Sequence, residues 1–234
     1  MADLKNLEEK IGYTFTDQTY LQRAVTHSSY ANETGEKNHH LHCYERLEFL
    51  GDAVLSILTS EYLYRRFPNA PEGDLTRMRA ALVCEDALAS YAEELSLGSY
   101  LYLGKGETAN GGAHKPAILA DAFEALLAAI YLDAGENGKQ SVSGLLLPIL
   151  QSAVARLPAG GGDSKTFLQI FLQKEGSIRP EYRVVSETGP DHAKVFCVEA
   201  YLDSNCIGRG RGTTKRQAEQ EAAADALRLF GVDR

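Results

Sequence analysis

Two short segments place acidic side chains at helical spacing within apolar stretches: one runs from Glu45 to Asp52, and the other runs from Asp121 to Glu124. Along a helix, at about 100° per residue, Glu45, Glu48 and Asp52 fall within roughly 60° of one another. Asp121 and Glu124, at i and i+3, share a face of their own helix. Two such helices packed together would bring four carboxylates to one place.

A cluster of carboxylates favours metal-assisted chemistry. Like charges held close together and partly away from water repel, so the cluster either takes up protons or binds a cation. Oxygen ligands suit Mg²⁺, with Mn²⁺ as a substitute, better than they suit zinc. Because Mg²⁺ keeps bound waters and binds substrate phosphates, phosphodiester hydrolysis is the natural reaction. The opposing interpretation is a solvated helix face, and the strongly apolar surroundings of both acidic pairs weigh against it.

The sides of the two helices that lie opposite their acids are apolar. These sides carry large apolar residues, namely Leu47, Leu50, Val54 and Leu58 in the first helix and Leu119, Phe123, Leu126 and Ile130 in the second. Small residues, Ala125 and Ala128, flank the acids of the second helix and permit close approach of a metal, a phosphate or another helix.

The first acidic segment resembles the signature of the ribonuclease III family, and the resemblance covers nearly the whole chain. It rests on residues 21–30 (LQRAVTHSSY), 45–52 (ERLEFLGD), 72–79 (EGDLTRMR) and 115–125 (KPAILADAFEA). It implies an all-α catalytic domain that is an endonuclease. By motif position, it assigns metal ligation to Glu48, Asp52, Asp121 and Glu124, with Asp52 and Glu124 closest to the chemistry.

Three further residues of the catalytic part match the family pattern. The resemblance places Glu45 and Glu72 near the substrate channel. Phe49 projects about 40° from Glu45, toward the acidic face and away from the apolar stripe. In the family this position contributes to a homodimer contact, so the resemblance implies a symmetric homodimer with Phe49 near its interface. An aromatic side chain buried within its own domain is the alternative.

Length and composition bound the class of protein. A chain of 234 residues suggests one or two domains. We expect no membrane segment, because no apolar run is long enough, and no secretion signal at the N-terminus. Four scattered cysteines without Cys-x-x-Cys spacing fit reduced, mostly buried thiols and a cytoplasmic location. The glycine-rich stretch at 104–107 lacks Walker A spacing, so no nucleotide cofactor is expected.

A composition shift at residues 158–163, which include three consecutive glycines, predicts a flexible linker. We therefore predict a catalytic domain over 1–157 and a second domain over 164–234. Residues 1–163 carry 13 Lys and Arg against 22 Asp and Glu, whereas 164–234 carry 11 against 10. The overall charge of −8 is unfavourable for a nucleic-acid binder, but the cations concentrate in the C-terminal part.

The C-terminal part reads as helix, three strands and helix. The predicted elements are a helix over 166–173, strands over 182–188, 195–202 and 206–210, and a helix over 214–230. Arg209, Arg211, Lys215 and Arg216 crowd the start of the final helix, where cations are unfavourable unless an anion binds. A solvated first turn is the alternative interpretation for Lys215 and Arg216.

This pattern resembles the double-stranded RNA-binding domain, a small α+β module (α-β-β-β-α), over about 65 residues. The resemblance implies shape recognition of about 16 base pairs of A-form duplex. Three regions would contact RNA: one helix face, the loop before the second strand and the start of the final helix. Their residues are Thr166, Gln169 and Gln173; Pro190 and His192; and Thr214, Lys215 and Arg216.

The leading interpretation is a Mg²⁺-dependent endoribonuclease that cuts double-stranded RNA. If the chain follows the family, its products carry 5′-phosphate and 3′-hydroxyl ends with short 3′ overhangs, and its roles include processing of rRNA, mRNA and other RNAs. Two alternatives remain. A protein that binds structured RNA without cutting it would tolerate substitution of at least one of the four acids, yet all four are present. A hydrolase of small phosphoesters would not need the C-terminal module.

Overall fold

The structure is a computed structural model that describes residues 4–34, 38–68, 70–156, 164–175, 179–190 and 194–230. The chain divides into two compact units, residues 1–66 with 79–155 and residues 67–78 with 156–234. The predicted linker, 158–163, lies outside the described residues. The domain boundaries predicted from the sequence therefore stay a prediction.

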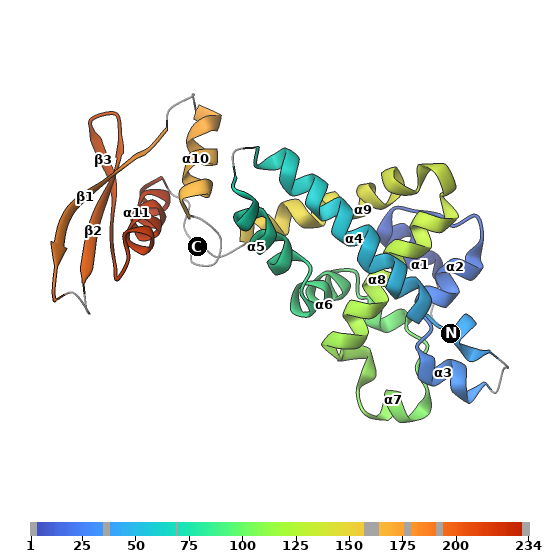
Figure 1. Cartoon of the computed structure of the whole chain (residues 1–234). Helices are drawn as coiled ribbons and strands as arrows, with labels where there is room; N and C mark the ends of the chain where they lie inside the picture. Colours follow the sequence, from blue (N-terminus) through green and yellow to red (C-terminus); the bar gives the residue numbers. More distant parts are fainter. Residues whose placement is uncertain are drawn as a thin grey trace. The chain divides into compact units, whose positions relative to one another are not determined.

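Helices make up the first unit (Figure 1). They are α1 (Leu4–Ile11), α2 (Gln18–Ala24), α3 (Ser28–Glu33), α4 (Glu45–Arg66), α5 (Glu72–Leu82), α6 (Glu85–Glu94), α7 (Lys105–Ala109), α8 (Pro116–Asp133) and α9 (Gly138–Arg156). Short 3₁₀ turns are η1 (His39–Leu41), η2 (Leu97–Tyr100), η3 (Gly112–His114) and η4 (Gly135–Asn137). The boundary between the two units falls within α5, after Met78.

Helix α8 forms the centre of the first unit. It packs against α2, α4 and α6, and most of its residues between Ile118 and Ile130 are buried. A helix that is apolar on nearly all sides is typical of the interior of a helical domain. Pro116 is suited to its first turn, where a missing N–H costs nothing. The predicted apolar face is confirmed, because Leu119, Phe123, Leu126 and Ile130 are all buried.

The second unit contains α10 (Ser164–Glu175), β1 (Glu181–Thr188), β2 (Val195–Leu202), β3 (Asn205–Gly212) and α11 (Lys215–Leu229). The strands form an antiparallel sheet in the order β1-β2-β3, against which α11 packs (Figure 1). Its core joins all these elements and includes Leu168, Leu172, Val198, Ile207 and Leu227. The predicted fold class, an all-α domain followed by an α-β-β-β-α module, is confirmed.

Helix α11 lies directly on the backbone of β3. Gly208, Gly210 and Gly212 alternate along the strand and face the helix. A Cβ added to Gly210 would lie 2.2 Å from both the carbonyl oxygen of Ala218 and the amide nitrogen of Ala222. Glycine is therefore required at this position by the close approach of helix and strand.

Side chains of α11 also cover the outer edge of β3. The backbone N–H groups of Arg209, Arg211 and Thr213 each donate to α11, and the acceptors are Asp225 Oδ2 at 3.0 Å, Glu221 Oε2 at 2.9 Å and Gln217 Oε1 at 3.0 Å. Four helix residues span about 6 Å, which is close to the length of two strand residues. Acceptors at every fourth residue of α11 therefore match donors at every second residue along β3. An edge strand otherwise presents free N–H groups to other chains.

The four cysteines are free thiols, but the expectation that they are mostly buried is wrong. Cys43 is buried and Cys197 is half-buried, whereas Cys84 and Cys206 are exposed. Each exposed thiol lies beside a loop or an edge strand rather than in a helical core, a placement that composition alone does not reveal. Among the described helices, each one falls short of the length or the apolar character needed to cross a membrane.

Candidate active site

The acids of α4 and α8 are brought together by a close contact between the two helices. A Cβ added to Gly51 would lie 2.0 Å from the carbonyl oxygen of Glu124. The α4 backbone therefore passes against the α8 backbone beside Asp52 and Glu124. The glycine that follows Leu50 in the acidic segment thus positions two of the predicted metal ligands.

Three of the predicted ligands lie close enough to the fourth, Glu124, to affect its ionisation. Burial, followed by repulsion from Asp52, Glu48 and Asp121, raises the pKa of Glu124 to about 7. Burial and then Asp121 raise the pKa of Glu48. Asp121 also has a raised pKa, first through burial. Asp52 itself is exposed, so the cluster opens to solvent on one side.

This arrangement fits a divalent cation in its donor chemistry. All four groups are carboxylates, and the pKa values of Glu48, Asp121 and Glu124 are raised by burial first and by neighbouring negative charge second. Among the residues that the structure describes, no three His, Cys, Asp or Glu side chains already converge to hold a metal ion. A divalent cation would offset the repulsion among these carboxylates and stabilise their convergence.

Three residues near the acids were missed by sequence reasoning. Tyr44 is buried, and its pKa is raised by burial and then by Asp121, Glu48 and Glu45. The ring of His27 packs edge-on against Tyr44 with 5.6 Å between centroids, and His27 lowers the pKa of Asp121.

Glu85, the third missed residue, raises the pKa of Asp121 by repulsion. His27 lies in a segment that carries the family resemblance, which was a usable signal. Tyr44 directly precedes Glu45, so its place beside the acids was also a usable signal, whereas the contact that brings Glu85 near Asp121 has no local sequence pattern.

The two predicted channel residues differ in what the structure reveals. Glu45 is exposed at the first residue of α4, and its charge raises the pKa of Glu48. Glu72 is exposed at the first residue of α5 in the other compact unit, where it accepts a 2.8 Å hydrogen bond from Thr76 Oγ1. A place beside a substrate channel stays a prediction for both residues.

Phe49 is 83% exposed on α4, so the alternative of an aromatic side chain buried in its own domain is excluded. Two other large apolar side chains of the same helix, Ile57 and Tyr64, are also exposed. At 100° per residue, the three lie within about 80° of one another. We call Phe49, Ile57 and Tyr64 the α4 apolar stripe.

In the second unit, the first turn of α11 carries two exposed cationic side chains. Thr214 caps the helix and accepts a 3.1 Å hydrogen bond from the Gln217 N–H. Lys215 and Arg216 follow in the first turn with exposed side chains, and Lys215 Nζ lies 3.2 Å from Glu187 Oε1. The pairing with Glu187 is solvent-exposed, and such pairs are weak.

The remaining predicted RNA contacts are described only in part. Gln169 is half-buried on α10, and Pro190 is exposed after β1. The side chains of Thr166 and Gln173 lie outside the described residues, as does His192. The role of all these residues in RNA binding stays a prediction.

Arg209 and Arg211 do not join the cations at the start of α11, contrary to the sequence expectation. Because Gly208, Gly210 and Gly212 face α11, the intervening arginines project from the opposite face of the sheet. Arg209 Nε lies 2.9 Å from Glu199 Oε1 on β2. The period-two alternation of glycine and arginine was the signal that could have placed them.

Comparisons with known proteins match both parts of the chain. Residues 17–149 match the family described as Ribonuclease-III-like, and residues 164–229 match the double-stranded RNA binding motif. Ribonuclease 3 of Bacillus cereus (strain AH187) is 45% identical over 229 residues, which cover 96% of this chain and 90% of that protein. Ribonuclease 3 of Bacillus anthracis (strain CDC 684 / NRRL 3495) gives the same values.

Solved structures give the same assignment for the helical part. One structure of the nuclease domain of ribonuclease III from Campylobacter jejuni is 38% identical, with a TM-score of 0.59, and covers 68% of this chain and 100% of that chain. A second structure of that domain, described as flexible in a region involved in dimer formation, is 39% identical with a TM-score of 0.58. It covers 64% of this chain and 97% of that chain.

Proposed function

This chain belongs to the ribonuclease III family, and from that premise we propose that it is a Mg²⁺-dependent endoribonuclease specific for double-stranded RNA. The observation that carries the proposal is the close contact of α4 with α8 at Gly51, where burial and then repulsion from Asp52, Glu48 and Asp121 raise the pKa of Glu124 to about 7. A protein that only bound RNA would have no need for so unfavourable a cluster.

Glu48, Asp52, Asp121 and Glu124 would hold the cation, with Mn²⁺ as a possible substitute for Mg²⁺. When bound, the ion supplies an activated water and stabilises charge on the scissile phosphate. The residues have distinct tasks. Asp52 is exposed and would be open to the incoming phosphate, whereas the half-buried Glu124 would release its proton when the ion binds. Asp52 and Glu124 are therefore the proposed catalytic residues.

Negative charge in the site explains why metal and RNA should bind together. Residues 1–163 carry 22 acidic against 13 basic residues, so the empty cluster repels a phosphate. Once a divalent ion neutralises the carboxylates, the repulsion becomes attraction. We expect each ligand to raise the affinity for the other.

A homodimer with two active sites would cut opposite strands and leave short 3′ overhangs with 5′-phosphate and 3′-hydroxyl ends. The α4 apolar stripe supports this proposal, because exposed patches of large apolar side chains are typical of protein interfaces. The Campylobacter jejuni nuclease domain is described with a region involved in dimer formation, which adds support by relationship.

The second unit would bind the RNA duplex. The match to the double-stranded RNA binding motif supports contacts through α10, the loop that includes Pro190 and His192, and the start of α11. Lys215 and Arg216 would neutralise phosphates across the major groove. The substrates we propose are precursors of rRNA, mRNA and other structured RNAs, processed in the cytoplasm, where free thiols such as those of this chain persist.

Cleavage of a long RNA duplex in Mg²⁺ and in EDTA tests the proposal directly. The chain should cut only with the metal, and Glu124→Gln or Asp52→Asn should abolish cutting while RNA binding remains. Glu9→Gln, at an exposed position of α1, is the matched control. Binding without cutting in the unchanged chain would favour the RNA-binding alternative, and unchanged turnover in either variant would remove that residue from the mechanism.

A further inference from the structure

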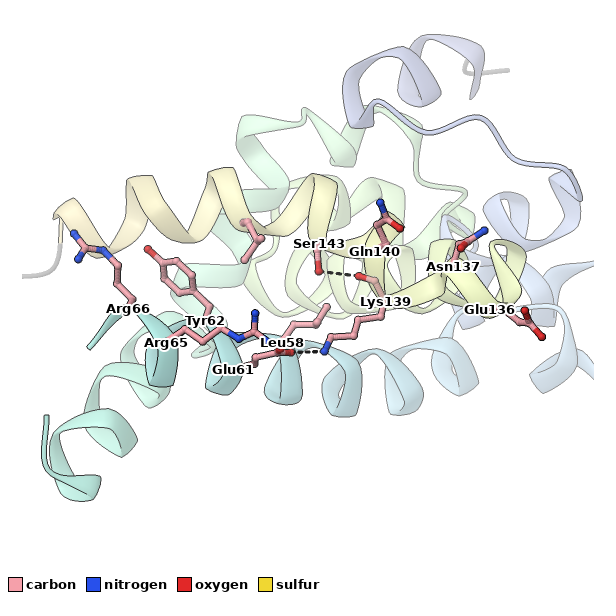
Figure 2. Close-up of a pocket in the computed structure, with 11 residues that line it drawn as sticks. Leu58, Glu61, Tyr62, Arg65, Arg66, Glu136, Asn137, Lys139, Gln140 and Ser143 are labelled. Atoms are coloured by element: carbon pink, nitrogen blue, oxygen red, sulfur yellow. Dashed lines mark hydrogen bonds and ion pairs between the residues drawn. The ribbon is translucent and has the colours of Figure 1, made fainter. Parts of the chain in front are cut away.

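A groove of about 620 Å³ lies between α4 and α9 (Figure 2). It begins at Leu58, more than a helical turn beyond the acidic segment of α4, and the proposed chemistry does not use it. Its volume is in the range of small-molecule sites, roughly 300–1,000 Å³. Leu58, Tyr62 and Leu147 supply apolar surface, and polar side chains from α4, η4 and α9 complete the lining.

The charge of the groove is opposite in sign to that of the surrounding part of the chain. Arg65, Arg66 and Lys139 line it together with two acids, Glu61 and Glu136. This local excess of cations occurs within a part of the sequence that carries 13 basic and 22 acidic residues. Arg65 and Lys139 have side chains that are 77% and 62% exposed, so they can turn toward a ligand. An anion is the favoured occupant.

Glu61 forms ion pairs with two of these cations, Arg65 and Lys139. Its carboxylate lies 2.5 Å from Lys139 Nζ and 2.6 Å from Arg65, and it thereby connects α4 with α9. Figure 2 shows Lys139 reaching across to Glu61. Ion pairs open to water contribute little because solvent screens them. A phosphate could therefore replace the carboxylate as the partner of both cations.

The rest of the lining suits a nucleobase. Tyr62 presents a half-buried aromatic ring beside Arg66, and an aromatic face stacks with any base. Asn137 of η4 and Gln140 of α9 also line the groove, and their amide groups can donate and accept hydrogen bonds. The Ser143 hydroxyl donates to the Lys139 carbonyl oxygen at 2.7 Å and can still accept one. A base offers a flat face and polar edges, whereas an acidic peptide would match the cations alone.

We propose that this groove binds a segment of single-stranded RNA, with a base on Tyr62 and backbone phosphates on Arg65 and Lys139. The proposal rests on the proposed function, because an RNA-cutting enzyme would meet unpaired segments next to its duplex substrates. Such a site would let the chain distinguish a duplex with single-stranded extensions from a blunt one.

The test uses the full chain in EDTA, a short adenylate RNA and an acidic peptide of aspartates as competing probes. Amide NMR shifts of Asn137, Gln140 and Ser143 report the groove, and fluorescence anisotropy gives the affinity. Arg65→Glu with Lys139→Glu should weaken RNA binding at the groove about tenfold, as loss of phosphate contacts does. Glu61→Gln should tighten it, because the competing carboxylate is gone. Lys105→Glu, on exposed α7, should change nothing.

The outcomes separate this inference from the proposed function. Shifts caused by the peptide but not by RNA, or by neither probe, would overturn the groove as an RNA site. So would equal affinity in all variants. Cleavage of a blunt duplex with Mg²⁺ is measured in parallel and should be unaltered by the groove variants. If the unchanged chain fails to cut while the groove still binds RNA, the proposed function falls and the inference stands.

Discussion

Among the four acids of the candidate active site, Glu124 has a pKa that is raised strongly, to about 7. It lies half-buried between Asp52, Glu48 and Asp121. In the unfolded chain this carboxyl group loses its proton near pH 4.5, whereas in the folded chain it keeps the proton up to about pH 7. Between these pH values, folding is therefore accompanied by uptake of one proton. The stability that the protonated form contributes is full below this window and is lost as the pH rises through it.

We expect Glu124→Gln to stabilise the metal-free chain at pH 8 by about 1–2 kcal/mol and to have little effect near pH 4.5. The magnitude is reduced from the full shift because the side chain is partly solvated. Urea unfolding in EDTA at both pH values measures it, with Glu9→Gln as the control. Adding Mg²⁺ should reverse the order at pH 8, since the ion stabilises only the carboxylate form. An equal effect at both pH values would contradict the raised pKa.

Local geometry explains which site residues the sequence predicts. The shared face of Glu45, Glu48 and Asp52 follows from the helical repeat alone, so it could be stated before the fold was known. Tyr44 directly precedes Glu45 and could have been noticed in the same way, whereas Glu85 reaches Asp121 through packing between separate segments, which no local spacing encodes. The raised pKa values likewise depend on burial, which only the folded chain defines.

At the scale of elements, glycines set the distances on which both units depend. Gly51 lets α4 touch α8, and Gly210 lets α11 touch β3. The α-β-β-β-α order was predictable from the switch between helical and alternating apolar patterns. The direction of Arg209 was not predicted, although its neighbouring glycines contained the information, because its charge suggested a role at the helix start.

Gly51→Ala should destabilise the first unit by about 3 kcal/mol and weaken metal binding, because the new methyl would meet the carbonyl oxygen of Glu124 and no rotamer can relieve a clash with backbone. Thermal unfolding and Mg²⁺ titration measure both effects. Gly144→Ala is the matched control, since Gly144 is exposed in α9 with open space around it and should gain roughly 0.5–1 kcal/mol. Equal stability of the two variants would refute the role given to Gly51.

The edge cover of β3 predicts a specific pattern of amide exchange. Glu221→Ala with Asp225→Ala should speed hydrogen exchange at the amides of Arg209 and Arg211 by roughly tenfold, because each loses its acceptor. The Thr213 amide, which donates to Gln217, should stay protected in the same molecule. Glu221→Gln with Asp225→Asn keeps an acceptor oxygen at both positions and should preserve protection. Uniform exchange across these variants would argue against the cover.

At the scale of the whole molecule, the exposed α4 apolar stripe is the surface that we expect a second copy of the chain to cover. Phe49→Asp should weaken self-association by on the order of 2 kcal/mol, as expected for a central aromatic residue of an interface. Sedimentation over a range of concentrations measures it. Leu229→Asp, at an exposed apolar position on α11, is the control and should leave the mass unchanged. A dimer of undiminished affinity in Phe49→Asp would remove this residue from the interface.

The exposed thiols have a practical consequence. Cys84 and Cys206 are accessible and lie in different units, while Cys43 is buried. Maleimide donor and acceptor dyes would therefore label each unit once in the Cys197→Ser variant, at cysteines that the chain already contains. Energy transfer between the dyes would report any change in the separation of Cys84 and Cys206 when duplex RNA is added.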